Sequence, residues 1–296
     1  MVEATKEWFE MIFDCVIYSG ESELLISRVN YLSKVCDRFI VVEGTTTFSK
    51  IPRVLDQATK LHLQNKYGEK ILWTYYSPSD TEDPGWPIES STREHIKTML
   101  VAATAGDLVL ISDVDEIPSI AAINEMNSVP GIISLSMEFH KYDLCLKSSN
   151  QWMGTIGFKF ESTNISIQDY RMMSVQYWLH PDVKIIQGGW HLSGITSVEG
   201  FKKKIMSFSH LELNRTGFNS RIYLSVIKYL GISITGDEVY EWNSNQNLES
   251  ILNLSCKKHY FKRFRHWLGI IIRPIIARQF KKFIGELSIP EKYSSS

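Results

Sequence analysis

Short apolar segments alternate with segments of helical periodicity along the first 140 residues. Unbroken apolar runs of this length predict strands that are buried on both faces. The runs lie at 11–18, 38–42, 71–76, 108–111 and 131–137. Apolar residues spaced three and four apart predict helices between and after them, at 23–36, 52–66, 90–105 and from 119 onward. This alternation indicates an α/β fold with a mostly parallel central sheet flanked by helices.

Several residues mark the expected ends of these elements. Pro52 suits a first helical turn, and Ser90 or Ser91 and then Ser119 suit helix N-caps. Beyond residue 140 the pattern weakens, and 140–185 predicts short strands mixed with loops. A strand at 184–187 is expected to end at the Gly188-Gly189 pair, and a helix capped by Ser197 is expected to run to residue 208.

Composition narrows the classes of protein to consider. The chain has 296 residues, 44% of them hydrophobic, which is enough for a large core in one or two domains. Its 32 Lys and Arg against 33 Asp and Glu exclude a global nucleic-acid-binding charge. Four separated cysteines indicate neither a zinc site nor a disulfide framework, which favours a reducing compartment. With no signal-peptide pattern and no membrane-spanning run, we expect a cytoplasmic protein.

The charge pattern changes near the end of the chain. Residues 250–285 contain nine Lys and Arg, no Asp or Glu, and interleaved aromatic and branched apolar residues. A basic amphipathic segment is typical of peripheral binding to an anionic membrane, here its inner face. The alternative is a solvated helix whose apolar face packs on the protein. We therefore expect a main domain over 1–249 and a basic helical tail over 250–296.

The sharpest local motif is Asp113-Val114-Asp115-Glu116, directly after the predicted strand at 108–111. Residues two apart in an extended backbone point the same way. Asp113 and Asp115 can therefore face one site at the carboxyl end of a strand, where open α/β sheets bind ligands. Adjacent carboxylates repel unless a cation lies between them, and their oxygens suit Mg²⁺ or Mn²⁺, which bridge phosphates. The motif predicts a nucleotide diphosphate site, with a solvated acidic turn as the structural alternative.

Two other functions of the acidic motif match its neighbours less well. A calcium loop of the EF-hand type fails because Pro118 stands where that loop needs glycine. A phosphatase with an aspartyl nucleophile also has Asp-x-Asp after a strand, but generally near the N-terminus.

A second motif, Gly188-Gly189-Trp190-His191, is expected to hold its histidine on an exposed, tightly turned backbone. Beside a metal-binding Asp-x-Asp, His191 is a candidate third ligand.

Further motifs keep a fixed order over about residues 11–210. They are Phe13-Asp14, Gly20-Glu21, Leu24-Leu25-x-x-Arg28, Val42-Glu43, Thr47-Phe48, Pro52-Arg53, Gly85-Trp86, Arg93, Ile111 to Pro118, Gly189-Trp190-His191-x-Ser193, Glu199-Gly200 and Lys204. Together they resemble glycosyltransferase family 17, known for β-1,4-N-acetylglucosaminyltransferases. The last 80 or so residues resemble no family.

The resemblance implies an inverting nucleotide-sugar transferase with a GT-A-type sandwich over 1–249. It implies UDP-N-acetylglucosamine as the sugar donor and Mn²⁺ or Mg²⁺ as the cofactor. From the sequence we expect no membrane anchor and stem of the kind that the animal members have. We therefore expect a glycan or lipid-linked glycan acceptor in bacterial surface polysaccharide synthesis, and no nucleic-acid partner.

The resemblance also implies roles for individual residues. Asp115 would bind the metal directly, Asp113 would bind the metal or a ribose, and His191 would be the third metal ligand or a diphosphate contact. Glu43, after the second strand, would reach the base or the ribose.

Arg28 and Arg93 would neutralise phosphate oxygens, with ion pairs to Glu43 or Glu89 as the alternative. Inversion needs a general base near the acceptor hydroxyl, and Asp169 is preferred. The full set of candidate bases is Glu138, Asp143, Glu161, Asp169 and Asp182.

Two other functions stay open at this point. The first is a metal-dependent phosphatase that uses the same carboxylates. The second is a non-catalytic adaptor at a membrane surface, in which the acidic turn has no chemical role.

Overall fold

The computed structural model describes residues 10–161, 166–175, 178–207, 209, 219–243, 246–254 and 262–285. A sheet of nine strands forms its centre, in the order β3-β2-β1-β4-β7-β6-β10-β5, with β11 beside β7. The first four strands in this order are parallel. They are β1 (Ile12–Tyr18), β2 (Arg38–Gly44), β3 (Ile71–Tyr76) and β4 (Leu108–Asp113).

The other half of the sheet is mixed. β7 runs antiparallel to β4, β6 and β11, whereas β10 is parallel to β6 and antiparallel to β5. These strands are β5 (Glu116–Ile117), β6 (Ile132–Lys141), β7 (Leu146–Lys159), β10 (Val183–Ser193) and β11 (Glu241–Trp242). A separate hairpin joins β8 (Ser174–Val175) to β9 (Trp178–Leu179). The chain thus has a mixed α/β fold, and the expected mostly parallel sheet is correct only for the β3-β2-β1-β4 half.

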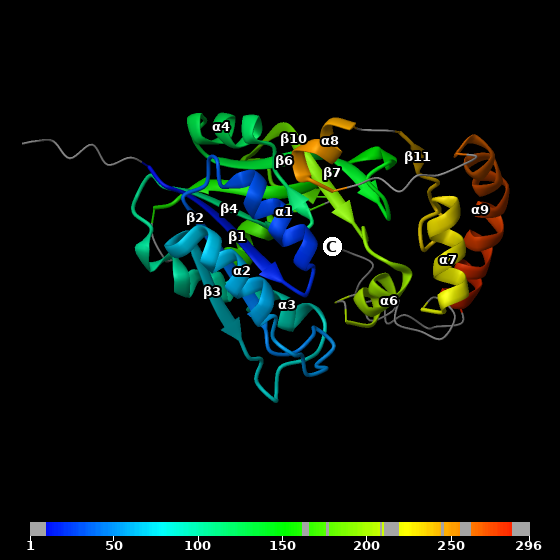
Figure 1. Cartoon of the computed structure of the whole chain (residues 1–296), viewed down its shortest axis with the longest axis horizontal. Coiled ribbons are helices and arrows are strands. Elements are labelled where there is room, and N and C mark those ends of the chain that lie inside the picture. The colour runs from blue at the N-terminus through cyan, green and yellow to red at the C-terminus, as the bar shows by residue number, and fades with distance from the viewer. Residues whose placement is uncertain are drawn as a thin grey trace, which may run out of the picture.

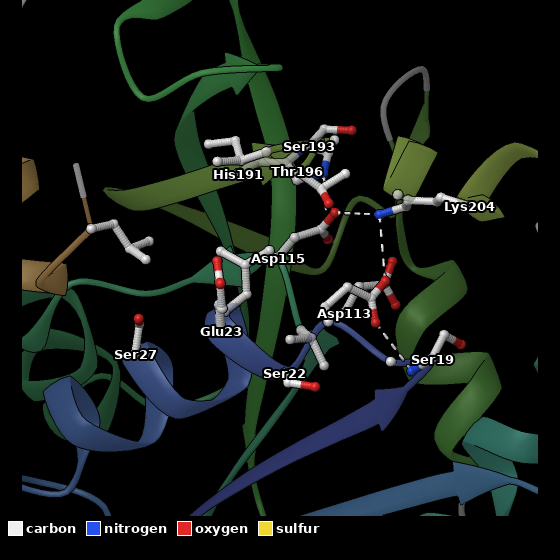
Figure 2. Close-up of a pocket in the computed structure, with 18 of the residues that line it drawn as sticks. Ser19, Ser22, Glu23, Ser27, Asp113, Asp115, His191, Ser193, Thr196 and Lys204 are labelled. Carbon is white, nitrogen blue, oxygen red and sulfur yellow. Dashed lines mark hydrogen bonds and ion pairs between the residues drawn. The ribbon is translucent and has the colours of Figure 1, made fainter. Parts of the chain in front are cut away.

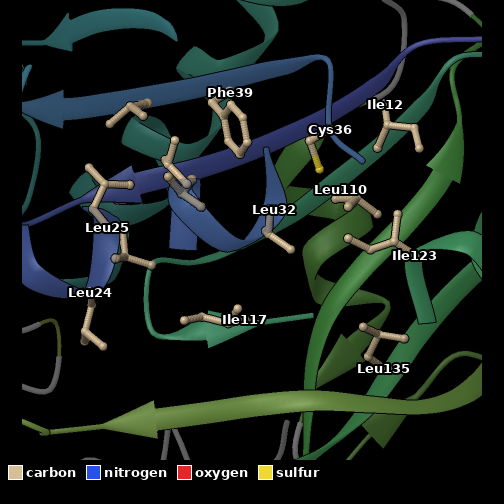
Figure 3. Close-up of a cluster of buried hydrophobic side chains, with 14 of the residues drawn as sticks. Ile12, Leu24, Leu25, Leu32, Cys36, Phe39, Leu110, Ile117, Ile123 and Leu135 are labelled. Atoms are coloured by element: carbon tan, nitrogen blue, oxygen red, sulfur yellow. The ribbon is translucent and has the colours of Figure 1, made fainter. Parts of the chain in front are cut away.

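Alternating side chains of the parallel strands enter two hydrophobic cores, one on each face of the sheet. In β1, Val16 belongs to the first core and Cys15 to the second, because successive residues of a strand point to opposite faces. Figure 3 shows the first core, where Leu32 of α1 (Ser22–Leu32) lies near Leu110 of β4 and Leu25 lies further along the same helix. Burial on both faces explains why these strands are unbroken apolar runs.

The helices around the sheet are α2 (Gln57–Tyr67), α3 (Trp86–Glu94), α4 (Ile120–Ser128) and α5 (Ile167–Met172), with 3₁₀ turns η1 (Gly68–Lys70) and η2 (His95–Ala102). Ser119 caps α4 as predicted, since its hydroxyl accepts the N–H of Ala122. Two predicted starts are wrong. α2 begins after Asp56, whose carboxylate accepts the Thr59 N–H, and α3 begins after Gly85, ahead of the serines at 90 and 91.

The later helices are α6 (Val198–Ser207), α7 (Arg221–Leu230), α8 (Gln246–Leu252) and α9 (Lys262–Gly285). Figure 1 shows α7 and α9 side by side at one end of the molecule, where they share a third hydrophobic cluster. Leu248 and Leu252 of α8 belong to the first core, so the predicted boundary at residue 250 lies inside a packed helix. None of the described helices is long and apolar enough to cross a membrane.

The cysteines differ from expectation. Cys15 and Cys36 are free and buried, but Cys145 is disulfide-bonded. One bonded cysteine is not the disulfide framework that the sequence argues against, but it weakens the inference of a reducing compartment.

Candidate functional site

A cavity of about 1350 Å³ opens where β1 and β4 end together. Its walls come from the first turns of α1, the β4–β5 turn, the ends of β6 and β10, and α6. Figure 2 shows Asp113, Asp115, His191 and Lys204 around this space, with Glu23 rising from α1. The cavity therefore lies at the carboxyl end of the parallel strands, where the sequence predicts a ligand site.

Arg28 of α1 anchors the β4–β5 turn from below. It is fully buried and donates two hydrogen bonds to the carboxylate of Asp14, at 2.7 and 2.6 Å. Its third nitrogen, Nη1, donates to the carbonyl oxygens of Asp113 and Glu116 at 3.1 and 2.5 Å. All of the guanidinium nitrogens are thus engaged within the protein. Arg28 fixes the backbone of the acidic motif and does not line the cavity.

Two more arginines neutralise the acidic motif. Arg93 of α3 lies 3.1 Å from Asp113 and 2.7 Å from Glu89. Arg171 of α5 lies 2.7 Å from Glu116 and 3.5 Å from Asp113. Desolvation opposes ionisation of Asp113, but the charges of Arg171 and Arg93 outweigh it and hold its pKa below the usual value. The side chain of Asp113 is still 37% exposed, so it presents a negative charge to the cavity.

Asp115 is the most buried acid of the cavity lining, at 5% exposure. One carboxylate oxygen accepts a hydrogen bond from Lys204 Nζ at 2.8 Å, and the other lies 3.6 Å from His191 Nε2. Burial opposes its ionisation, but Lys204 and His191 hold its pKa well below the usual value. The pKa of Lys204 is raised: burial opposes its charge, but Asp115 and Glu21 outweigh it. Both groups are therefore charged at neutral pH.

His191 lies within β10, next to the acidic motif. Its backbone pairs with Glu116 of β5, and the Leu192 N–H donates to the Asp115 carbonyl at 2.7 Å. The imidazole is 6% exposed and stacks on the ring of Phe139, with 5.0 Å between ring centroids. The expectation of an exposed, turned backbone is wrong, because the strand continues through the glycine pair.

The glycine pair forms a bulge in β10 rather than its end. The register with β6 shifts between Gln187 and Trp190. Gly189 has a φ of +93°, and a Cβ there would lie 2.5 Å from the carbonyl oxygen of Ile117. Only glycine suits this position, and the bulge re-aims the residues that follow it. The motif thus places His191 opposite Asp115.

The structure brings some of the predicted site residues together and not others. Asp113, Asp115 and His191 line one cavity. Glu43 does not line it: this carboxylate is fully buried and accepts the Asp56 N–H at 2.9 Å. Arg93 forms an ion pair with Glu89, as the structural alternative predicted. Arg28 pairs with Asp14, which is neither of the acids, Glu43 and Glu89, named in that alternative.

Asp169 is also outside the cavity lining. It lies on the exposed side of α5, in the first turn. Of the five candidate bases, Asp143 alone lines the cavity, and its Oδ1 accepts the Cys145 N–H at 3.0 Å. The preferred base is therefore not placed to reach a substrate in the cavity.

Three basic residues were given no role from sequence. Lys204 belongs to a family motif, but Arg171 and Lys141 lie in no recognisable pattern. Lys141 lines the cavity and donates to Ser193 at 2.8 Å. Burial and the charge of Lys204 lower the pKa of Lys141 to about 8. Among the described residues, no group of three or more His, Cys, Asp or Glu could hold a metal ion.

Comparisons with solved structures give low similarity. A galactosyltransferase, LgtC, in complex with donor and acceptor sugar analogues is 12% identical, with a TM-score of 0.34; 96% of this chain and 99% of that chain are covered. An inositol-1-phosphate CTP transferase from T. maritima is 9% identical, with a TM-score of 0.35; the coverage is 66% and 95%. TM-scores this low do not establish a shared fold.

Sequence comparison is more informative. The chain matches none of the curated proteins with which it was compared. The model of glycosyltransferase family 17, however, matches residues 3–241, which is most of the chain and all of the cavity residues named above. The resemblance seen in the motifs is thereby confirmed. The chain belongs to glycosyltransferase family 17 and is a glycosyltransferase.

Proposed function

We propose that the protein transfers a sugar, N-acetylglucosamine, from its UDP conjugate to a hydroxyl of a glycan acceptor with inversion. One observation carries the proposal: in a chain of this family, Asp113, Asp115, His191 and Lys204 meet in one cavity at the carboxyl ends of parallel strands. Carboxylates and an imidazole suit a divalent ion, and a lysine suits a phosphate. We propose a GT-A-type donor site on this basis.

Asp115 and His191 would hold the ion. The facing oxygen and nitrogen are 3.6 Å apart. Two donors that each lie about 2.1 Å from one ion must be within about 4.2 Å of each other, so this pair fits. Mg²⁺-type sites commonly use one or two protein ligands and take the rest from phosphate and water, which suits a site with fewer than three clustered ligands. A bound ion would act as a Lewis acid on the leaving diphosphate.

The lysines would bind the diphosphate directly. Lys204 contacts Asp115 and lies 3.6 Å from Glu21, so its ammonium is already held at the cavity wall. An incoming diphosphate carries a larger total negative charge than either carboxylate and can therefore attract this ammonium. Lys141 adds a second ammonium on the same side of the cavity. Asp113, whose oxygens contact Arg93 and Arg171, is better suited to accept a ribose hydroxyl than to bind the ion.

We assign the general base to Glu23 in place of Asp169. Glu23 lies in the first turn of α1, is exposed, and points into the cavity (Figure 2). It makes no hydrogen bond or ion pair with any other described residue. A base must keep a carboxylate oxygen available for the acceptor hydroxyl. Asp143 is less available than Glu23, because it is buried and already accepts a backbone N–H.

The acceptor is proposed to be a glycan or lipid-linked glycan of a surface polysaccharide. Ligand cavities generally measure about 300–1000 Å³. At about 1350 Å³, this cavity has room for the end of an acceptor beside the donor.

The test is a product assay with a panel of UDP-sugars, Mn²⁺ and glycan acceptors, read by mass spectrometry. We expect a product heavier than the acceptor by one N-acetylhexosamine residue, and none with Asp115→Asn. Glu125→Gln, which changes an exposed acid of α4 outside the cavity, is the matched control and should keep full activity. Release of inorganic phosphate from a monoester without turnover of any UDP-sugar would refute the proposal in favour of a phosphatase.

A further inference from the structure

Helix α9 has two apolar faces, and only one of them is covered. Leu268, Ile272 and Ile276 pack into the third hydrophobic cluster against α7. Five other large apolar residues are exposed. One is Ile270 at 51%, and the other four are Phe264 at 57%, Trp267 at 56%, Ile271 at 48% and Ile275 at 60%. The packing alternative considered from sequence therefore accounts for one face and leaves the second without a partner among the described residues.

Four of the five exposed residues form one continuous row, here called the α9 stripe (Phe264, Trp267, Ile271 and Ile275). Their spacings of three and four place them on one side of a helix. The rings of Phe264 and Trp267 are in contact, with centroids 6.0 Å apart. Exposed apolar residues are ordinary when scattered, but a row of this length marks an interaction surface.

The segment of the chain that carries the stripe has charge of one sign. Nine of the chain's 32 Lys and Arg residues, and none of its 33 Asp and Glu residues, lie in 250–285. Arg278 follows Ile275 by three residues and is exposed on the same row. Arg273 is also exposed but lies on the opposite side of the helix, where it donates a long hydrogen bond, 3.5 Å, to the Asp237 carbonyl. Arg265 differs, because it is buried and donates to the Tyr229 carbonyl at 2.8 Å.

We propose that the α9 stripe docks the protein on an anionic lipid surface. A single helix with aromatic and branched residues on one row and basic residues around it can lie in the headgroup plane with the apolar row inserted. The uniform positive charge matches anionic phospholipid and opposes pairing with a second copy of the same segment. α9 cannot span the bilayer instead, because Arg273, Pro274 and Arg278 interrupt its apolar residues.

Docking in this way would tether the catalytic cavity to the membrane, with α7 and α6 between α9 and the cavity. α9 packs on α7, and α7 packs on α6, which carries Lys204. Figure 1 shows α6 between the sheet and the α7–α9 pair. A lipid-linked acceptor in the same surface would then be within reach. Docking itself needs no catalysis, so it can fail while the proposed reaction stands.

The test is sedimentation of the full chain with phosphatidylcholine vesicles, with and without phosphatidylglycerol. We expect binding to the anionic vesicles only, weakening as salt rises. Each Lys or Arg at such a surface contributes about fivefold in partitioning, so Arg278→Gln should weaken binding about that much. Phe264→Ser/Trp267→Ser should abolish it.

Two exposed residues of α7, Ile222 and Val226, supply the matched control. Ile222→Ser/Val226→Ser removes similar apolar surface away from the stripe and should leave vesicle binding unchanged. Circular dichroism should show all variants folded, since every substituted side chain is exposed. If the Phe264→Ser/Trp267→Ser variant does not fold, the Arg278→Gln variant tests the proposal alone, and unchanged binding of that variant to anionic vesicles would contradict it.

Three outcomes would overturn the proposal. The full chain could ignore anionic vesicles, or it could bind neutral and anionic vesicles equally. The wild type could also be a dimer that binds no vesicles, while the Phe264→Ser/Trp267→Ser variant is a monomer. The stripe would then be a contact between two copies of the chain.

Discussion

Removing the guanidinium of Arg28 should destabilise the protein more than removing any exposed arginine. Arg28 and Asp14 are 0% and 1% exposed and are joined by two short hydrogen bonds. Arg28→Met would leave the Asp14 carboxylate buried without a counter-charge, which costs about 3–5 kcal/mol. The loss is a large part of a typical unfolding free energy of about 5–15 kcal/mol.

Urea unfolding followed by tryptophan fluorescence measures this cost. Arg221→Met is the matched control, because Arg221 is 76% exposed and pairs with Glu199 at the surface; it should cost less than about 1 kcal/mol. Asp14→Asn/Arg28→Met should cost clearly less than the sum of the single variants, since the two groups interact directly.

Two results would refute this reasoning. One is a cost for Arg28→Met as small as that for Arg221→Met. The other is strict additivity in the double variant. Either result would mean that the Arg28–Asp14 pair does not hold the acidic turn in place, and that the contacts of Arg28 with the carbonyls of that turn do not stabilise it.

Three further predictions follow from individual contacts. Gly189→Ala should lower the unfolding free energy by about 1–3 kcal/mol and weaken UDP binding, because the new Cβ meets the Ile117 carbonyl; unchanged stability would contradict the bulge. Burial opposes ionisation of Asp56, but its hydrogen bonds, of which that from Tyr18 is the largest, outweigh burial and lower the pKa of Asp56 to about 2. The ionised carboxylate therefore stabilises the fold above the usual aspartate pKa, and this contribution is lost as the pH falls through about 2. Asp56→Ala should therefore lower the free energy of unfolding, measured in urea, by about 1–2 kcal/mol at pH 7 and by less at pH 2. An equal loss at the two pH values would contradict this role of the Asp56 carboxylate. Glu23→Gln should lower kcat about 10²–10⁴-fold and leave UDP affinity unchanged by calorimetry; loss of UDP binding instead would remove Glu23 from the acceptor side.

The strands that could be predicted from sequence are those with both faces buried. β3 begins and ends at the predicted residues, and β1 and β2 differ by one or two residues, because burial on two faces leaves an unbroken apolar run. β7 could not be predicted, because residues 149–151 are exposed and glycines interrupt it. Those glycines permit close packing: a Cβ at Gly154 would lie 2.2 Å from Met137 Sδ.

The site could be predicted in part, for a related reason. Asp113 ends β4 and Asp115 lies in the turn after it, so their location is a local property of the sequence. The proximity of His191 followed from the family resemblance, whereas its burial in a strand could not be predicted, because a glycine pair suits a bulge within a strand as well as a turn after it. Arg171 reaches Glu116 through the packing of α5, and no local pattern encodes a contact across 55 residues.

The most direct test of the donor site is calorimetry of UDP binding with and without Mn²⁺. Asp115→Asn removes a proposed ion ligand, and Glu23→Gln removes a carboxylate of the same cavity that is not proposed to bind the ion. We predict that Mn²⁺ strengthens UDP binding to the wild type and to Glu23→Gln, and has no effect on binding to Asp115→Asn. UDP binding to Asp115→Asn with the full Mn²⁺ dependence of the wild type would contradict the account.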